Sequence, residues 1–384
     1  MPDSAEMPAP VRTRSERAAA TASRARATAA SIHRSLALLK GLMLCLSCGS
    51  FGFNAAAQVP AHHGESGFRN TYPHPPKESY WRWKWEQLRD GVPEPPAGGW
   101  KFPHVKTDAA ALRANGSRPT ATWIGHAAFL IQLGGRNVLV DPQFSARASP
   151  VAFAGPRRIV ALPIDVPELP RIDAVLVSHN HYDHLDLDSV KRLAAMPGGS
   201  PLFLVPLGLK RWFVEQGIAR VEELDWWQSR EVGGLRFTLV PVQHWSKRTL
   251  WDANLSLWGG WVVEGAGLKV IHTGDLGYSR DALDIGARLG PFDLALIPIG
   301  AYAPRWFMKT MHVNVPEALQ VRSDLRAARA IGMHWGTFES LTDEPMDEPP
   351  AELARLRHAA GLPAEAFDVM AVGETRSILP GARP

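Results

Sequence analysis

The chain has 384 residues, of which 45% are hydrophobic and 21% are charged, a composition typical of a soluble globular protein with a large core. Its formal net charge of +4 comes from residues 1–57, which hold seven Lys or Arg and three acidic residues, whereas the remainder is neutral. Because the main body is neutral, the basic character of the whole chain gives no indication of nucleic-acid binding, and we expect no nucleic-acid partner.

The first 57 residues form a segment unlike the rest. A basic stretch rich in Ala, Ser and Arg runs to Lys40, and the apolar segment GLMLCLSCGSFGF follows it. That apolar segment is too short to cross a bilayer comfortably, and Ala55 and Ala57 in NAAAQ match the small-x-small rule of signal peptidase. We expect residues 1–57 to be a signal peptide, cleaved before Gln58 for export to the periplasm. The alternative is an uncleaved membrane anchor.

The next stretch, residues 58–115, is rich in Pro, Trp and charged side chains. We expect an irregular N-terminal arm packed on the main body, with one short helix around Tyr80–Asp90. From Pro119 the pattern changes, because TATWIGHAAFLIQLGGRNVLVDP alternates like two or three strands with Gly134-Gly135 as a hairpin turn.

Short strands, helices and loops then alternate to the C-terminus. Strands are predicted at Ala174–Val177, Leu202–Val205, Leu235–Val240, Ser256–Glu264, Leu268–His272, Leu294–Pro298 and Ala328–Met333. Helices are predicted at Leu187–Ala195, Leu207–Gln216, Arg280–Leu289, Val315–Leu325 and Pro349–Ala360. Mixed sheets flanked by helices suggest a layered α/β or α+β sandwich. No repeat or second linker appears, so we expect residues 116–384 to form one domain.

The stretch VSHNHYDHLDL is the most informative motif, since it follows the buried strand AVLV directly. His179 and His181 alternate on one side of an extended segment, and Asp183 and His184 follow where the chain turns into a helix. Four polar groups beside a buried strand need a common partner. This H-x-H-x-D-H spacing supplies imidazoles and a carboxylate in two neighbouring clusters, which suits two borderline metal ions.

Further candidate ligands stand at the ends of later strands. His244 closes FTLVPVQH, Asp275 follows LKVIHTG, and His334 closes ARAIGMH. The full set of five histidines and two aspartates can supply three terminal ligands per metal plus one bridging carboxylate, with water or hydroxide as the other bridge. Two ions roughly 3.5–4 Å apart would lower the pKa of that hydroxide and clamp a phosphoryl or acyl oxygen.

For the other histidines a structural role is the simpler interpretation. A lone histidine at a strand end is usually structural, and we expect His272 to lie in the core or behind the ligands. The histidines expected at the surface are His62, His63, His74, His104 and His358.

These motifs, in this order, resemble the metallo-β-lactamase superfamily, whose αββα sandwich carries a binuclear metal site. Longer stretches are similar to its N-acylphosphatidylethanolamine-hydrolysing phospholipase D branch, and the similarity covers nearly all of residues 117–378. The stretches are WIGHAAFLIQL, DPQFSARASP, IDAVLVSHNHYDHLD, ELDWW, QHWSKRTLWDAN, GPFDLALIPIGAYAPRWFMK, HVNVPEAL and HWGTF. The resemblance implies an α+β fold of the αββα type, in a single domain with an N-terminal arm.

The resemblance also implies roles for individual residues. One zinc would be held by His179, His181 and His244, and the other by Asp183, His184 and His334, with Asp275 bridging them. Iron or manganese can replace zinc in such sites. The residues implied in catalysis are Asp183, Asp275 and His312. His312 would stabilise the transition state or protonate the leaving oxygen, and His126 and Asp141 would support the ligands from behind.

The implied reaction is hydrolysis of N-acylphosphatidylethanolamine, or a related phospholipid, to phosphatidic acid and N-acylethanolamine by attack of a metal hydroxide. The residues expected to contact the substrate are Trp245, Arg305, Trp306 and Lys309. Aromatic groups beside cations suit acyl chains, phosphate headgroups and peripheral contact with a membrane surface. Core packing is the alternative for each aromatic residue. A homodimer is one possible assembly.

Two other functions compete with this interpretation. The first is a metallohydrolase of a soluble phosphodiester or lactone on the same binuclear site, which would need no apolar groove. The second is a binding protein that has kept the fold and lost catalysis, although the intact set of seven ligands argues against it. A redox di-iron site is a weaker third alternative, because no Gly-rich flavin-binding loop is present.

Overall fold

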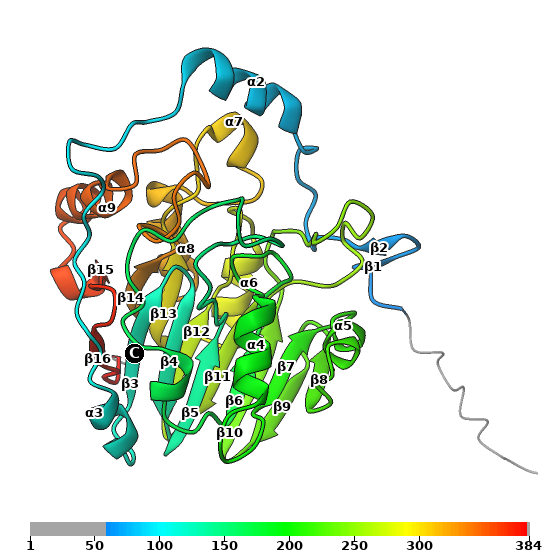
Figure 1. Cartoon of the computed structure of the whole chain (residues 1–384), viewed down its shortest axis with the longest axis vertical. Helices are drawn as coiled ribbons and strands as arrows, with labels where there is room; N and C mark the ends of the chain where they lie inside the picture. The colour runs from blue at the N-terminus through cyan, green and yellow to red at the C-terminus, as the bar shows by residue number, and fades with distance from the viewer. Residues whose placement is uncertain (1–58, 382–384) are drawn as a thin grey trace, which may run out of the picture. The chain divides into compact units, whose positions relative to one another are not determined.

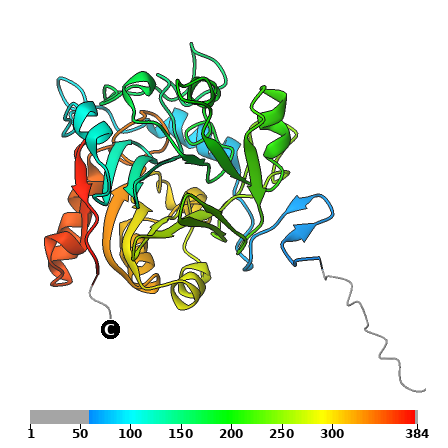
Figure 2. The ribbon, with the colours of Figure 1, turned by 90° about the horizontal axis from the view of Figure 1, so that it is seen from below.

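The computed structural model describes residues 59–381, so the signal peptide expected at residues 1–57 lies outside the described part. The described residues belong to one compact unit that includes the arm. Two seven-stranded sheets lie one behind the other in Figure 1 and appear as two packed layers in Figure 2. Helices cover the outer faces, and the predicted αββα sandwich is confirmed. Within residues 59–381, no helix combines the length and apolar character needed to span a bilayer.

The first sheet contains the strands from the N-terminal half and one from the C-terminus. In spatial order they are β16 (Thr375–Ser377), β3 (Thr120–Gly125), β4 (Ala128–Leu133), β5 (Arg136–Val140), β6 (Ala174–Leu176), β7 (Leu202–Pro206) and β8 (Val221–Leu224). The hairpin between β4 and β5 turns at Gly134-Gly135 as predicted, because both glycines have the positive φ that a two-residue turn requires. From β5 to β8 the strands are parallel.

The second sheet is built from the later strands. In spatial order they are β15 (Phe367–Val369), β14 (Ala327–Met333), β13 (Phe292–Pro298), β12 (Leu268–His272), β11 (Gly260–Gly265), β10 (Leu235–Val240) and β9 (Ser229–Val232). Neighbours from β12 to β15 are parallel, and β9 to β12 are antiparallel.

Helices flank both sheets. The first sheet carries α3 (Ala109–Ala114), α4 (Leu187–Ala194) and α5 (Lys210–Glu215), and the second carries α6 (Asp281–Arg288), α8 (Val315–Asp324) and α9 (Glu348–Ala359). The remaining short elements are the hairpin β1 (His63–Gly64) and β2 (Gly67–Phe68), the helix α7 (Arg305–Met308), and the 3-10 turns η1 (Val166–Glu168) and η2 (Ala364–Ala366).

Two predicted elements start three or more residues later than expected, and in both cases backbone bonds to another element explain the difference. The strand predicted from Ser256 begins at Gly260, because the N–H groups of Leu257 and Gly259 donate to carbonyls that follow strands of the first sheet. The helix predicted from Leu207 begins at Lys210, because the N–H of Leu207 continues the pairing with β8. Tertiary hydrogen bonds thus override local propensity at these positions.

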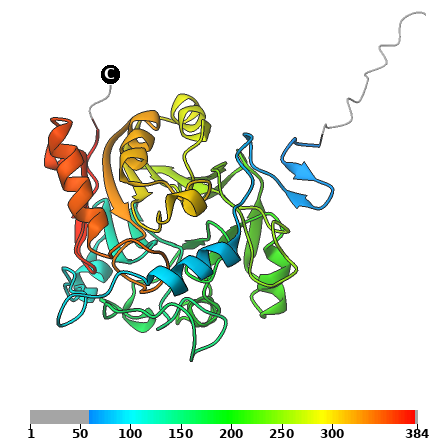
Figure 3. The same ribbon diagram turned by 90° about the horizontal axis from the view of Figure 1, so that it is seen from above.

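The arm contains the helix α2 (Tyr80–Asp90), whose bounds agree with the prediction. Ser79 caps it by accepting a hydrogen bond from the N–H of Arg82. Trp83 is its buried residue and stacks on Phe307 of α7 with ring centroids 4.9 Å apart. In Figure 3, α2 runs across the end of the molecule where the loops that follow the parallel strands emerge.

Four buried tryptophans connect the core to those loops. Trp261, between the sheets, donates its indole N–H to the carbonyl of Val177 (2.8 Å). The other three indoles do the same with carbonyls at or just after strand ends: Trp258 with Val242 (2.9 Å), Trp335 with Gly332 of β14 (3.2 Å) and Trp123 with His126 (2.9 Å). Val177, Val242 and Gly332 each stand two residues before a predicted metal ligand. The core therefore fixes the backbone from which these ligands project.

Replacing Trp261 with Phe keeps most of the apolar volume but leaves the buried carbonyl of Val177 without its donor. We expect the free energy of unfolding to fall by about 1–3 kcal/mol. Urea unfolding of the variant beside Trp85→Phe, an exposed position on α2, measures this difference. Equal stability of the two variants would show that the indole donor contributes nothing.

Candidate metal centre

The predicted ligands gather at one end of both sheets because the strands that carry them run in the same direction. In the first sheet β3, β5 and β6 are parallel to one another, and in the second β10, β12 and β14 are. Their carboxyl ends therefore meet at the same edge. The loops that follow them bring together His126, Asp141, His179, His181, Asp183, His184, His244, Asp275 and His334.

Three histidines form one cluster. The Nε2 atom of His179 lies 2.8 Å from Nδ1 of His181, and Nε2 of His244 lies 3.4 Å from that same Nδ1. The donor atoms are close enough to bind a single ion together. This is the set that the resemblance implies for one of the two metals.

A second cluster surrounds Asp183. Its Oδ2 lies 3.0 Å from Nε2 of His126, 3.3 Å from Nε2 of His334 and 3.6 Å from Nε2 of His184. These four residues also offer donor atoms within reach of one ion. The cluster contains the three ligands implied for the other metal, with His126 beside them.

Asp275 stands between the two clusters. Its Oδ2 is 3.1 Å from Nε2 of both His184 and His334, 3.8 Å from Nε2 of His179 and 3.9 Å from Nε2 of His244. A single carboxylate is therefore within reach of both groups of imidazoles. This position fits the bridging role that the resemblance implies.

The chemistry of these donors fits a bound cation. Several of their atoms are buried and make no hydrogen bond within the described chain: Nε2 of His184 and His334, and Oδ1 of Asp275. Burying a polar atom without a partner is costly. Imidazole nitrogens and carboxylate oxygens are the ligands that borderline divalent metals prefer. These residues would therefore hold metal ions at this point.

The electrostatics of the centre point the same way. Burial alone would raise the pKa of Asp275, but the imidazoles of His184 and His334 hold that pKa well below its ordinary value. Burial likewise opposes the charge on His184, yet the carboxylates of Asp275 and Asp183 keep its pKa well above 6.5. The centre thus attracts positive charge, and metal binding at neutral pH must displace protons.

Hydrogen bonds from behind fix the orientation of the ligands. Asp141 accepts from Nδ1 of His184 (2.8 Å) and from both the N–H and the hydroxyl of Ser178 (2.7 and 2.6 Å). Nδ1 of His244 lies 2.9 Å from the carbonyl of Met311. In both histidines Nε2 is consequently the atom that faces the centre.

His126, Asp141 and His334 share a strained backbone. Each has a φ between 43° and 61°, a left-handed conformation that residues other than glycine seldom adopt. Such conformations persist where the surrounding structure imposes them, often at functional sites. His272, expected in the core or behind the ligands, is fully buried and contacts the carbonyl of Ala127 through Nε2 (2.8 Å).

His312 lies between α7 and α8 and faces the centre. Its ring centroid is 5.4 Å from that of His244 and 5.3 Å from that of His334. Burial is the main cause that lowers its pKa to about 4. A neutral imidazole suits donation of a hydrogen bond to a developing charge better than delivery of a proton.

Of the four residues expected to contact the substrate, Trp245 is the one whose ring contacts a predicted ligand. The ring of Trp245 packs edge-on against His181, with centroids 4.8 Å apart, and Lys77 of the arm lies over its face. Arg305 donates to the carbonyl of His312 (2.8 Å) and to Glu317 (2.8 Å), which supports the position of His312. The indole of Trp306 donates to Glu86 of α2, and Lys309 is exposed.

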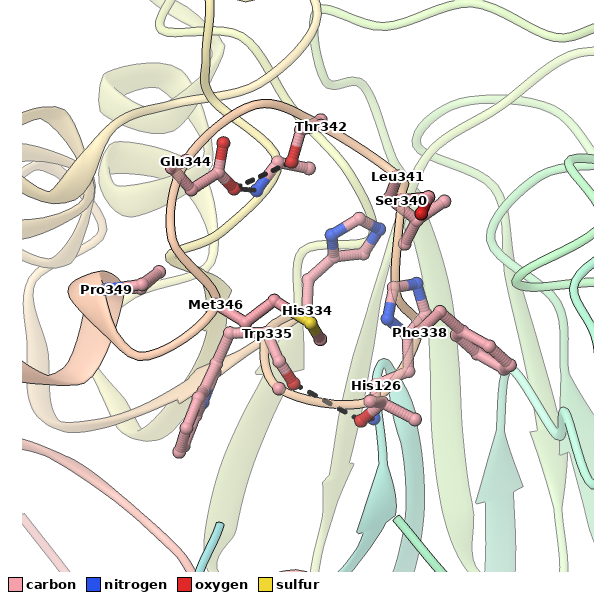
Figure 4. Close-up of a pocket in the computed structure, with 13 residues that line it drawn as sticks. His126, His334, Trp335, Phe338, Ser340, Leu341, Thr342, Glu344, Met346 and Pro349 are labelled. Atoms are coloured by element: carbon pink, nitrogen blue, oxygen red, sulfur yellow. Dashed lines mark hydrogen bonds between the residues drawn. The ribbon is translucent and has the colours of Figure 1, made fainter. Parts of the chain in front are cut away.

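A narrow pocket adjoins the second cluster. Figure 4 shows it between His126 and His334 on one side and Leu341, Glu344 and Met346 on the other. It offers about 30 Å³, enough for one or two water molecules. A space of this volume is too small to hold an acyl chain.

The arm contributes a residue that the sequence pattern did not indicate. The side-chain amide of Asn70 donates to the carbonyl of His244 (3.0 Å) and accepts from its N–H (3.0 Å). The indole of Trp258 donates to the same amide oxygen (3.2 Å). Asn70 thus holds the backbone of a predicted ligand, and no motif in GFRNTYP signals this role.

Comparison with known proteins agrees with the geometry. A model of the Beta-lactamase superfamily domain matches residues 136–335. N-acyl-phosphatidylethanolamine-hydrolyzing phospholipase D 1 of Caenorhabditis elegans is 45% identical over 249 residues, which cover 62% of this chain and 70% of that protein. The chain belongs to the metallo-β-lactamase superfamily. Within it, the chain belongs to the N-acylphosphatidylethanolamine-hydrolysing phospholipase D branch.

Two further similarities concern enzymatic class and fold. A metal-dependent hydrolase of Methanopyrus kandleri is 33% identical over 250 residues, covering 64% of this chain and 94% of that protein. The structure of an isothiocyanate hydrolase from Delia radicum gut bacteria shares the fold, with a TM-score of 0.54 and 21% identity over 68% of this chain and all of that one. This member of the metallo-β-lactamase superfamily is a metal-dependent hydrolase.

Asn70 yields a test of how the arm supports this metallo-β-lactamase centre. Asn70→Ala removes both hydrogen bonds to the backbone of His244, and we expect metal affinity to fall by about 10- to 100-fold, as for other residues that orient ligands. Competition with a chromophoric chelator measures the affinity. Asn70→Asp keeps only the acceptor, and its metal affinity should lie between those of the wild type and Asn70→Ala.

The matched control is Ser66→Ala, an exposed position in the same arm. A merely structural role would lower the melting temperature of Asn70→Ala and leave its metal affinity equal to that of the control. That result would contradict the positioning role.

Proposed function

We propose that the protein is a zinc-dependent phosphodiesterase of the phospholipase D type, which hydrolyses N-acylphosphatidylethanolamine or a related phospholipid. The observation that carries this proposal is the convergence of five histidines and two aspartates on one centre in a chain similar to a phospholipase D of this kind. The products would be phosphatidic acid and N-acylethanolamine.

In this proposal His179, His181 and His244 hold one ion, and a second is held by Asp183, His184 and His334, with Asp275 shared. When bound there, two zinc ions would supply an activated water and neutralise the phosphate charge. The chain itself sets the geometry, because Asp141 and Asn70 fix two of the ligands from behind.

In this proposal His312 acts on the substrate phosphate. Arg305 holds its carbonyl, and its Nδ1 is buried without a partner in the described chain. As a neutral imidazole it would donate a hydrogen bond to a phosphate oxygen as charge develops there. We therefore favour stabilisation of the transition state over protonation of the leaving group.

The outer face of α2 supports peripheral association with a lipid surface. Trp81, Trp85 and Leu88 recur at helical spacing on one face and are 79%, 63% and 77% exposed, whereas Trp83 on the other face is buried against α7. The same helix has a net charge of +1, because three basic residues outnumber two acidic ones, although Arg82 and Arg89 are paired with Glu86 and Asp90. Aromatic and basic side chains together suit the interface of an anionic bilayer.

Two loops at the same end of the sheets also expose apolar side chains. Leu250 and Trp251, in the loop after the strand that carries His244, are 78% and 86% exposed. Phe153, in the loop that follows Asp141, is 83% exposed. Both loops leave the same end of the sheets as the metal centre. Trp306, by contrast, is held against Glu86 and Arg82. We therefore assign the first bilayer contact to α2 and these loops and not to Trp306.

The reaction is tested by incubating the purified protein with N-acylphosphatidylethanolamine in mixed micelles and identifying the products by mass spectrometry. We expect phosphatidic acid and N-acylethanolamine. Asp275→Asn should lower the rate by about 100-fold or more, because it removes the shared carboxylate. Asp188→Asn, an exposed carboxylate on α4, serves as the control and should keep full activity.

Release of fatty acid would show that another bond is cleaved and would contradict the proposal. Hydrolysis of a soluble phosphodiester or a lactone, with the lipid left intact, would favour the alternative hydrolase on the same centre.

Membrane contact is tested by sedimentation with vesicles of phosphatidylglycerol and phosphatidylcholine. Replacing Trp81 and Trp85 together with Glu removes two large apolar side chains and adds negative charge. We expect the vesicle affinity to fall at least about tenfold. Val214→Glu, an exposed apolar position on α5, is the control. Equal binding of both variants would show that α2 does not meet the bilayer.

A further inference from the structure

A third group of metal-binding side chains lies apart from the main centre. It joins the beginning of the arm to the turn between β8 and β9. Nε2 of His62 lies 2.6 Å from Oδ1 of Asp225, and Nε2 of His63 lies 2.8 Å from Oδ2 of the same carboxylate. Two consecutive histidines thus face one aspartate, each through the same ring atom, and the three donor atoms are close enough to share an ion.

The two histidines were expected at the surface, and the structure corrects that expectation. Both are half-buried, because neighbouring aromatic rings enclose them. His62 stacks on Trp226 with ring centroids 4.4 Å apart, and His63 packs edge-on against His62 (4.5 Å) and Phe68 (5.2 Å). This enclosure fixes the ring orientations, as outer contacts do around metal ligands.

Hydrogen bonds fix the orientation of Asp225, in the ELDWW stretch, as the aromatic rings fix the two histidines. The N–H of Trp226 donates to its Oδ1 (2.7 Å), and its own N–H donates to the side chain of Gln228 (3.0 Å). Its side chain is only 10% exposed. Within residues 59–381, the cationic partners recorded for this carboxylate are the two imidazoles, and no Lys or Arg pairs with it.

A buried carboxylate needs a compensating positive charge. Two imidazole nitrogens and one carboxylate oxygen form a mixed donor set that borderline divalent ions of the first transition row prefer. The separations of 2.6 and 2.8 Å between donors are close to the 2.8 Å between His179 and His181 in the main centre. The His63 side chain is 29% exposed, which leaves one side open to water as a further ligand.

We propose that His62, His63 and Asp225 form a separate binding site for one divalent transition-metal ion, with zinc as the expected occupant. The ion would fasten the start of the arm to the turn between β8 and β9. This segment is continuous with Asn70, which holds His244, so the site would secure the arm that supports the main centre. The proposal does not depend on which substrate the enzyme hydrolyses.

The test counts zinc per chain. Tag-free protein is saturated with Zn²⁺, passed through gel filtration and measured by plasma mass spectrometry. We expect His62→Gln/His63→Gln to hold one zinc fewer per chain than the wild type. His358→Gln, an exposed histidine on α9, is the matched control and should hold as much as the wild type.

A second background separates this site from the main centre. In His179→Ala/Asp275→Asn, where the main centre is disrupted, one tightly held zinc should remain and should be lost when His63→Gln is added. If circular dichroism shows that the histidine variants do not fold, Asp225→Asn replaces them, because it keeps the shape of the side chain. Its loss of one zinc would support the site.

Equal zinc contents in wild type and folded variants would overturn the proposal. The three residues would then be a hydrogen-bonded anchor without a metal. A second result would also overturn it: the histidine variants lose one zinc when the main centre is intact, but the protein with the disrupted main centre holds no zinc at all. The histidine substitutions would then act through the main centre.

Discussion

The structure depends on one electrostatic constraint: the buried carboxylate of Asp275 faces imidazoles from both clusters at the edge of two packed sheets. Among residues 59–381, hydrogen bonds do not satisfy several of these atoms. A bound cation would offset the free-energy cost of burying these atoms. The centre can exist in this form because parallel strands from both sheets end at the same place and supply the loops that carry the ligands.

Rigid support extends well beyond the ligands. Trp261, Trp258 and Trp335 each donate to a carbonyl two residues before a predicted ligand, so the packed core holds three of the loops directly. The arm adds a further support, because the side chain of Asn70 forms two hydrogen bonds with the backbone of His244. Its helix α2 lies across the same end and presents aromatic side chains outward. The core and the arm therefore hold the centre together, and the lipid contact that we propose would use the exposed face of α2.

Much of the fold and of the centre could be predicted from the sequence. The H-x-H-x-D-H spacing from His179 and the strand-end positions of His244, Asp275 and His334 identified the residues that the structure brings together. The helix α2 was also predicted, and the glycine pair identified the hairpin between β4 and β5. Long-range pairing could not be predicted, because β8 and β9 have weak local patterns and Leu257 bonds to the other sheet. For the same reason Asn70, His62 and His63 gave no signal: their partners are more than 150 residues away.

The most direct test of the central claim is anomalous diffraction at the zinc absorption edge from crystals of the zinc-loaded protein. The account predicts two peaks in the main centre, about 3.5–4 Å apart. One should lie among His179, His181 and His244, and the other beside Asp183, His184 and His334, with Asp275 in contact with both. A single peak, or none, would contradict a binuclear centre built from these seven residues.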